Sequence, residues 1–373
     1  MRKYVSCFLV LILISCNSSD SDTEAVVTTI SDNTSTTITQ ADNDTSSKDT
    51  TTTTLAANEE YVFDKEKMSP FTGLELPPEL WLKRPRRVIA FKIDNNLNAR
   101  PQSGIQEADA VFEVLVEGGM TRLLAFFYDK TSTYLGPIRS ARPTDPTLVR
   151  PYGGVLVVSG ATGGLITDIN SLGVRVLEEQ PSPVMFRISD RKAPHNLYAD
   201  TELVREDVDS KGFPFNPPAE PIYRFGTNQD NWLEGANRLT VKFSNTTTII
   251  WKLDDKQYSR FIIDSYAPTE DAVAHNFVTR DGYSDILKSE TVVVIQGPLY
   301  NDEATTLPSV LTVGIGPAYI FNNGKYITGN WRRTDISESF ELYDDNQNLI
   351  YVPPSSQWVH VLPLSGEVTW SDS

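Results

Sequence analysis

The chain has 373 residues, of which 39% are hydrophobic, and it carries 33 Lys and Arg against 49 Asp and Glu, a net charge of −16. Nucleic-acid binding needs clustered cations that displace phosphate counterions, and adsorption to anionic lipid needs a polybasic patch, so this charge argues against both. Three histidines and two cysteines argue against a closed Cys/His zinc site, and we predict neither a metal ion nor a cofactor. The length suits one large domain or two modest ones.

The N-terminus has the pattern of an export signal. A charged start precedes an apolar run, residues 5–14, which is too short for a membrane-spanning helix and is typical of a secretory signal. The run ends at Ser15-Cys16, which resembles a bacterial lipobox, where a small residue precedes a cysteine that is acylated and becomes the new N-terminus. We therefore predict a lipoprotein signal peptide at residues 1–15 and lipidation of Cys16, with an ordinary cleaved signal as the alternative. This would attach the protein to the bilayer at the extracytoplasmic face of the cell membrane.

A polar segment follows the signal. Residues 17–60 contain 13 Thr and 7 Ser, with nine acidic residues and one lysine. Such a segment buries too little apolar surface to offset the entropy of ordering. We predict a disordered tether at residues 16–60 that holds the folded part away from the membrane.

The first folded part alternates strands and helices. Residues 88–94 and 154–159 are typical of buried strands, and the runs 111–117 and 120–127 flank Gly118-Gly119, a turn signal for a hairpin. Helices are predicted at residues 165–172 and 201–211. This alternation predicts an α/β (α+β) domain at residues 61–220.

The second part is dominated by strand patterns. Prolines between residues 214 and 221 indicate a boundary. The strands predicted after it are residues 238–243, 247–253, 258–263, 291–295 and 310–315. Asn323-Gly324 between two further strand patterns is a second hairpin signal. We predict a mainly antiparallel β domain at residues 221–373.

Cationic side chains beside Gly and Pro residues are the strongest sign of a site. Guanidinium groups suit bidentate capture of carboxylate or phosphate, and loops usually carry sites. The predicted ligand-binding residues are Gly118, Gly119, Arg122, Arg139, Arg142, Arg187 and His195. The alternative is that these arginines only tie loops together by pairing with Glu113, Glu117 and Asp145.

The candidates for catalysis are His195 and Ser140. An imidazole near neutral pH can act as a base or bind an anion, although a loop histidine bonded to backbone is the plainer interpretation. Ser140 lies between two arginines but in no Gly-x-Ser-x-Gly turn. A triad of Ser140, His195 and Asp145 is permitted by composition alone. The glycine-rich stretch 159–164 is either an anion-binding nest or a tight strand-to-helix turn.

These segments resemble the YerB-like family of bacterial lipoproteins, which has a two-part domain of unknown function. The resemblance is carried by residues 70–73, 93–95, 99–104, 108–119, 121–122, 136–143 (Gly-Pro-Ile-Arg-Ser-Ala-Arg-Pro) and 193–198 (Ala-Pro-His-Asn-Leu-Tyr). It implies an α/β first part, a β-rich second part and attachment to the outer face of a membrane, and it implies no known reaction. This chain departs from the family pattern at Val158-Ser159 and at His275-Asn276-Phe277.

Our first hypothesis is a membrane-anchored binding or scaffolding protein of the cell envelope with an arginine-rich anion pocket. Its partner would be a cell-wall fragment or an acidic envelope protein. The alternative is an envelope hydrolase or transferase that uses His195 with Ser140 or a carboxylate. A third hypothesis is a structural lipoprotein that binds partners by β-strand addition.

Overall fold

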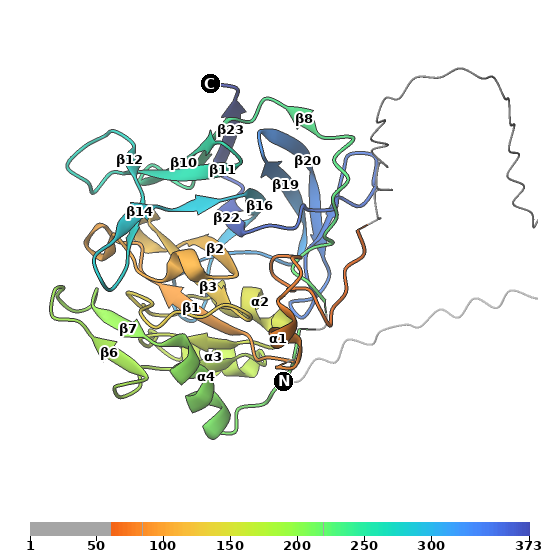
Figure 1. Ribbon diagram of the computed structural model, residues 1–373. Coiled ribbons are helices and arrows are strands. Elements are labelled where there is room, and N and C mark those ends of the chain that lie inside the picture. Colours follow the sequence, from red (N-terminus) through yellow and green to blue (C-terminus); the bar gives the residue numbers. More distant parts are fainter. Residues whose placement is uncertain (1–60, 84, 219) are drawn as a thin grey trace, which may run out of the picture. The chain divides into compact units, whose positions relative to one another are not determined.

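An 11-stranded mixed sheet runs through both halves of the chain in the computed structural model (Figure 1). Its strands are β1 (Ile89–Ile93), β2 (Ala110–Leu115), β3 (Thr121–Phe127), β4 (Val155–Val157), β5 (Arg175–Leu177), β8 (Leu233–Glu234), β16 (Thr291–Gly297), β19 (Gly314–Asn322), β20 (Lys325–Arg333), β21 (Glu341–Tyr343) and β22 (Gln357–Pro363). The order is β21-β20-β19-β16-β22-β2-β3-β1-β4-β5, with β8 beside β20. The strands of the first half therefore occupy one side and those of the second half the other, and they meet at the parallel pair β2–β22.

A second sheet of six strands comes entirely from the second half of the chain. It consists of β9 (Arg238–Lys242), β10 (Thr247–Asp254), β11 (Gln257–Asp264), β12 (Val273–Ala274), β15 (Lys288–Ser289) and β23 (Glu367–Ser371). Three two-stranded ribbons are β6 (Met185–Arg187) with β7 (Leu197–Ala199), β13 (Asn276–Val278) with β14 (Ser284–Ile286), and β17 (Leu299–Asn301) with β18 (Pro308–Val310). The helices are α1 (Pro78–Trp81), α2 (Asp145–Val149), α3 (Leu165–Ser171) and α4 (Thr201–Ser210), with 3-10 turns η1 (Leu97–Ala99), η2 (Ile105–Glu107), η3 (Glu117–Gly119) and η4 (Arg150–Tyr152).

The structure describes residues 61–83, 85–218 and 220–373. The predicted signal peptide, Cys16 and the tether at 16–60 lie outside the described residues. Among the described residues, no helix is both long and apolar enough to cross a membrane.

Both faces of the large sheet are buried, because successive side chains of a strand point to opposite faces. Phe112 of β2 faces one core, which includes Phe71 from the N-terminal segment. Its neighbour Val111 faces the other core, which the small sheet covers with Trp251 and α4 covers with Val204. The body therefore has three layers, and residues from both halves fill each core.

The predicted fold class is confirmed. The first half is α/β, with β4 and β5 parallel on either side of α3, and the second half is mostly antiparallel. Both predicted hairpins form: Gly118 and Gly119 have φ of 72° between β2 and β3, and Asn323 and Gly324 have φ of 49° and 78° between β19 and β20. The predicted division at about residue 220 stays a prediction, and the structure adds that the two halves share one sheet and two cores.

Two details differ from the sequence-based expectation. The strand predicted at 310–315 is interrupted: β18 ends at Val310, the amide of Leu311 bonds to Pro298 outside any ladder, and β19 starts at Gly314 with φ of 120°. In addition, β22 pairs in parallel with both β2 and β16, because it enters the middle of the large sheet from a long loop and does not form a hairpin.

Candidate anion site at the carboxyl edge of the sheet

Three polar residues follow the ends of strands that run in the same direction. β1 and β4 are parallel, and β2 has the direction of β1 because both are antiparallel to β3. Asp94 follows β1, Glu117 follows β2 and Ser159 follows β4. Ligand sites of open α/β sheets lie at this carboxyl edge, so the topology itself brings candidate side chains together.

Asp94 is the centre of the first cluster. It is 2% exposed, and its Oδ2 lies 2.7 Å from Nδ1 of His195. The carboxylate accepts, so Nδ1 carries the proton, and Nε2 of His195 has no hydrogen-bond partner in the described part of the chain. Nε of Arg139 lies 3.2 Å from the same Oδ2 as an ion pair without hydrogen-bond geometry. One carboxylate thus accepts a hydrogen bond from an imidazole and forms an ion pair with a guanidinium.

Glu117 is the centre of the second cluster. Arg142 donates from Nε to Oε2 of Glu117 at 2.6 Å and from Nη2 to Oε1, and Nη2 of Arg122 lies 3.3 Å from Oε1. Both arginines also donate to the carbonyl of Ser140, at 2.7 Å from Arg122 and 3.4 Å from Arg142. The loop before α2 therefore gathers Arg122 and Arg142 on one shared carboxylate and one shared carbonyl.

A buried ion pair lies behind these clusters. Nζ of Lys92 is 2.6 Å from Oδ1 of Asp145, and both side chains are fully buried. Lys92 and Arg122 share a face of the sheet because β1 and β3 place them on the side of the first core. The other carboxylate oxygen of Asp145 accepts the backbone amide of Arg142 at 2.7 Å, which ties the pair to the arginine loop.

Positive charge exceeds negative charge in this region, where Lys92, Arg122, Arg139 and Arg142 pair with three carboxylates. Burial, together with the charges of Arg122 and Arg142, lowers the pKa of Lys92 to about 8 against the attraction of Asp145. Burial, together with Arg142, lowers the pKa of Arg122 to about 10. Burial opposes the ionisation of Glu117, but the hydrogen bond from Arg142 and the charges of both arginines bring its pKa to about 2. The region is therefore favourable for an additional anion.

The predicted site residues are only partly brought together. Arg122, Arg139, Arg142 and His195 lie around Asp94 and Glu117, as described. Arg187 on β6 is exposed. It pairs with Glu179 at 2.5 Å and donates to Asn196, the neighbour of His195, at 2.8 Å, but it forms no ion pair with Asp94 or Glu117. The carbonyls of Gly118 and Gly119 accept hydrogen bonds from Thr246 and Ser244 of the second half. These glycines therefore shape the turn that carries Glu117, and their role in binding stays a prediction, as does the concave shape of the surface.

The Ser140, His195 and Asp145 triad is wrong. Asp145 is committed to Lys92 and to the backbone of Arg142, whereas Asp94 holds His195. The hydroxyl of Ser140 lies 3.4 Å from that of Ser159. The stretch 159–164 forms a strand-to-helix turn before α3, which has seven residues.

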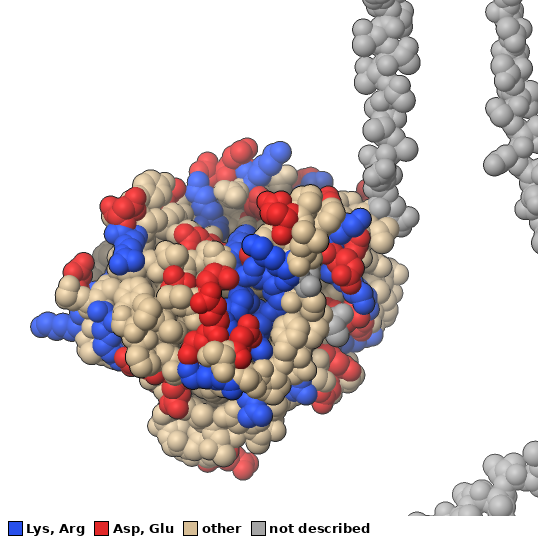
Figure 2. Space-filling view, turned by 60° about the horizontal axis from the view of Figure 1, so that its bottom comes forward, with Lys and Arg blue, Asp and Glu red and all other residues tan. Residues whose placement is uncertain are grey.

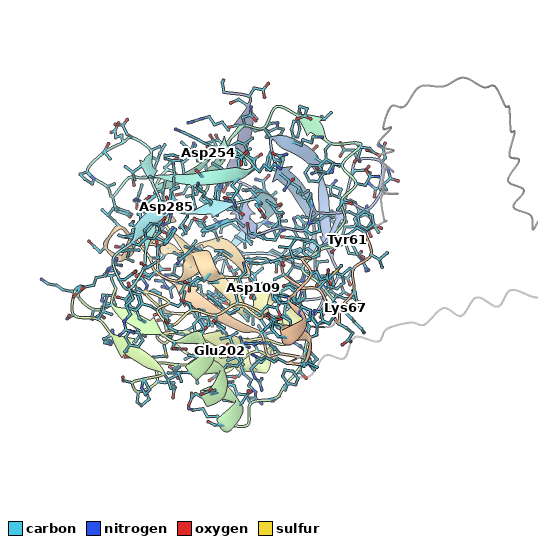
Figure 3. All side chains as sticks on the ribbon, viewed as in Figure 1. Tyr61, Lys67, Asp109, Glu202, Asp254 and Asp285 are labelled. Carbon is cyan, nitrogen blue, oxygen red and sulfur yellow. The ribbon has the colours of Figure 1, made fainter. Side chains whose placement is uncertain are left out.

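Sequence reasoning missed Asp94 and Lys92 as members of the site. The sequence signal that could have identified them is a lysine inside an otherwise apolar strand, with an aspartate directly after the end of that strand. Asp109, labelled in Figure 3, is not part of the site: its Oδ2 accepts the amides of Tyr128, Asp129 and Lys130 and anchors a turn.

A closed ring of buried hydrogen bonds joins the two sheets on the opposite face. Its six members are Glu113, Thr121, Asn95, Gln102, His275 and Arg260. Arg260 of β11 donates from Nη2 to both oxygens of Glu113, at 2.8 and 2.7 Å, and from Nη1 to Nδ1 of His275 at 2.5 Å. Nε2 of His275 then donates to Gln102 at 2.7 Å. Glu113, expected as a partner of the site arginines, is therefore held by Arg260 instead.

The charged surface of the body is mixed. On the face shown in Figure 2, Lys and Arg side chains gather with Asp and Glu side chains directly beside them. This fits the pairing of most cations described above.

Comparisons with known proteins agree with this fold. Residues 71–214 match the protein of unknown function (DUF3048) N-terminal domain, and residues 239–359 match its C-terminal domain. "Putative lipoprotein YerB" of Bacillus subtilis (strain 168) is 23% identical over 304 residues, which cover 80% of this chain and 87% of the relative. The chain belongs to the YerB-like family. The crystal structure of YerB protein from Bacillus subtilis matches this YerB-like chain with a TM-score of 0.67 at 22% identity, over 81% of this chain and 99% of that one, so the two share a fold. The two matched regions of the YerB-like chain lie on either side of residue 220.

Proposed function

We propose that this YerB-like chain is a lipid-anchored protein of the bacterial cell envelope whose folded body binds an anionic group at Asp94, Arg139 and His195. The lipid anchor is supported by the lipobox at Cys16 and by the description of the B. subtilis relative as a lipoprotein. Candidate ligands are a cell-wall fragment that carries carboxylate or phosphate, or an acidic segment of an envelope protein.

The proposed anion site rests on the incomplete hydrogen bonding of Arg139. Its side chain is 24% exposed, and its guanidinium makes no hydrogen bond to the described residues. Its single ion-pair partner, Asp94, is already hydrogen-bonded to His195. A planar fork with free donors at a partly open edge is suited to bidentate capture of carboxylate or phosphate. Arg122 and Arg142 behind it supply the positive field without being exposed themselves.

Arg139→Ala should weaken binding of inorganic phosphate or acetate to the full chain by at least about tenfold, because each charged hydrogen bond contributes about 1.5–3 kcal/mol. The melting temperature should change little, since Arg139 makes one ion pair only. Ligand titration followed by NMR, with calorimetric melting, measures both, and comparing the two anions separates a phosphate site from a carboxylate site.

Arg187→Ala is the matched control. It also removes an exposed guanidinium paired with a carboxylate, but the carboxylate is that of Glu179 and not that of Asp94 or Glu117. Equal affinities of the two variants, or a loss of stability in Arg139→Ala without a loss of binding, would contradict the proposed site.

A second function, hydrolysis or group transfer, is favoured by the dyad of Asp94 and His195. A buried carboxylate that fixes Nδ1 and leaves Nε2 free is the arrangement of a general base. In that case His195→Gln should abolish turnover of an envelope-derived ester, amide or phosphoester while anion binding by Arg139 persists. Loss of binding alone in His195→Gln favours the binding function.

Cys16→Ala should prevent lipidation. We expect uncleaved precursor or soluble protein in place of the membrane-bound form, because the thiol that carries the diacylglycerol is missing. Membrane fractionation and gel mobility, with and without globomycin, measure this. An unchanged size and membrane fraction under both treatments would refute the lipobox.

A further inference from the structure

A cavity lies apart from the residues of the carboxyl-edge site. Its volume is about 440 Å³, within the range of small-molecule sites, and it is lined by Pro151, Pro221, Tyr223, Arg333, Ser339 and Phe340, among others. These residues come from the loop after α2, the connection between the halves, and the segment around β20 and β21. The wall is largely apolar and aromatic.

Arg333 is a buried cation without a carboxylate partner among the described residues. It is 2% exposed, and all its acceptors are neutral: the carbonyls of Thr147 at 2.5 Å, Asp335 at 3.1 Å and Ile336, and the hydroxyl of Thr312 at 3.4 Å. Burial lowers its pKa to about 10. A buried arginine is normally accompanied by a negative charge, and here the described residues supply none within 4 Å.

The other charged residues of the lining have contacts of their own. Arg332 donates to Gln347 and lies over the ring of Tyr343. Arg224 lies 3.7 Å from Glu220 and 3.9 Å from Glu341. Glu338 accepts the hydroxyl of Thr334 at 2.7 Å. Arg333 therefore keeps only neutral hydrogen-bond acceptors among the described residues, and the charges of Asp335 and Glu338 act on it at longer range.

Tyr223 is a second, independent sign of a missing ligand. Its side chain is 1% exposed, it lines the cavity, and its hydroxyl has no hydrogen-bond partner in the described residues. Neighbouring Tyr152 has a partner in Ser339. An unsatisfied buried hydroxyl costs about 1–3 kcal/mol, so a ligand oxygen at this place would remove the penalty.

We propose that this cavity binds a small organic anion, with its apolar body against Phe340, Pro151 and Pro221 and its acidic group near Arg333 and the hydroxyl of Tyr223. The acidic group is a carboxylate, a sulfonate or a phosphate. This site is separate from the one at Arg139 and neither depends on the other.

The test uses 2-naphthoate and its uncharged counterpart 2-naphthamide, titrated into the full chain by isothermal calorimetry. The naphthoate should bind at least about tenfold more tightly than the naphthamide, because only the naphthoate carries a negative charge that can pair with Arg333. Tyr223→Phe should weaken naphthoate binding about fivefold without lowering the melting temperature, because it removes a hydroxyl that has no partner in the free protein.

A blocking variant keeps the proposal falsifiable without touching Arg333, whose bonds to Thr147 and Ile336 support the fold. Ser337→Trp at the exposed rim should abolish binding, whereas Ser284→Trp on β14, also exposed but outside the cavity, should not. No binding of naphthoate at millimolar concentration, equal binding of naphthamide, or binding that survives both Tyr223→Phe and Ser337→Trp would overturn the proposal.

Discussion

Replacing Glu113 with alanine should lower the free energy of unfolding by about 3–5 kcal/mol, the typical cost of leaving one member of a buried ion pair alone. Glu113 and Arg260 are both fully buried and are joined by two hydrogen bonds. The same carboxylate accepts the hydroxyl of Thr121 at 2.7 Å and the indole of Trp358 at 3.2 Å. The variant therefore leaves the buried charge of Arg260 without a partner and breaks the ring of hydrogen bonds that joins the two sheets. Urea unfolding followed by circular dichroism measures the loss.

Glu367→Ala is the appropriate control for this prediction. Glu367 is also a strand glutamate paired with a cation, Lys242 at 3.2 Å, but its side chain is 65% exposed. Exposed pairs contribute about 0–1 kcal/mol, so this variant should be nearly neutral. If both variants lose the same stability, the ring does not hold the sheets together.

The contribution of Glu113 also has a pH signature. Burial opposes its ionisation, but Arg260 and His360 outweigh burial and lower its pKa in the folded state. A lowered folded pKa means that the stabilisation is present above the ordinary pKa of a glutamate, about 4.3, and is lost as the pH falls below it. The deficit of Glu113→Ala relative to wild type should shrink in acid.

Asp145→Asn should cost a similar amount, about 3–5 kcal/mol near neutral pH or below, because it leaves Lys92 charged and fully buried beside two arginines. Asparagine retains an acceptor for the amide of Arg142, so the loss isolates the charge of the pair. The measurement is again urea unfolding, from about pH 6 to about pH 9.

Asp145→Asn and Glu113→Ala should respond differently to alkaline pH. The pKa of Lys92 is already lowered to about 8, and loss of Asp145 removes the charge that raises it. In the folded variant Lys92 therefore loses its proton while an unfolded lysine keeps one up to about pH 10.4, and stability rises with pH wherever the unfolded state binds more protons. An arginine stays protonated, so Glu113→Ala should not recover at about pH 9. A deficit in Asp145→Asn that is constant across this range would show that Lys92 is not charged in the folded state.

Local patterns predicted most strands and both hairpins, because alternation and glycine turns act over a few residues. Residues 120–127 and Asn323-Gly324 needed no information from elsewhere in the chain. The position of β22 was not predictable in this way. Its apolar run fits any central strand, and its neighbours β2 and β16 are chosen by packing of distant segments.

The candidate site was also only partly predictable from local patterns. Guanidinium groups near Gly and Pro pointed to Arg122, Arg139 and Arg142 from composition alone. Their carboxylate partners could not be assigned, because alternation alone would place Glu113 and Glu117, four residues apart, on one face of the sheet. Instead, β2 ends at Leu115 and the following turn η3 directs Glu117 to Arg142, while Glu113 within the strand bonds to Arg260.

The parallel pairing of β2 with β22 sets the order in which this protein can fold. Trp358 of β22 bonds to Glu113 across 245 positions of sequence, and the other neighbour of β22, β16, also belongs to the second half. Until the second half has folded, β2 remains an open edge strand, which is a template for pairing with other chains. Closing so long a loop is slow compared with forming local hairpins. The first half therefore stays incomplete until residues near 360 are available, and during that interval it is most prone to aggregation.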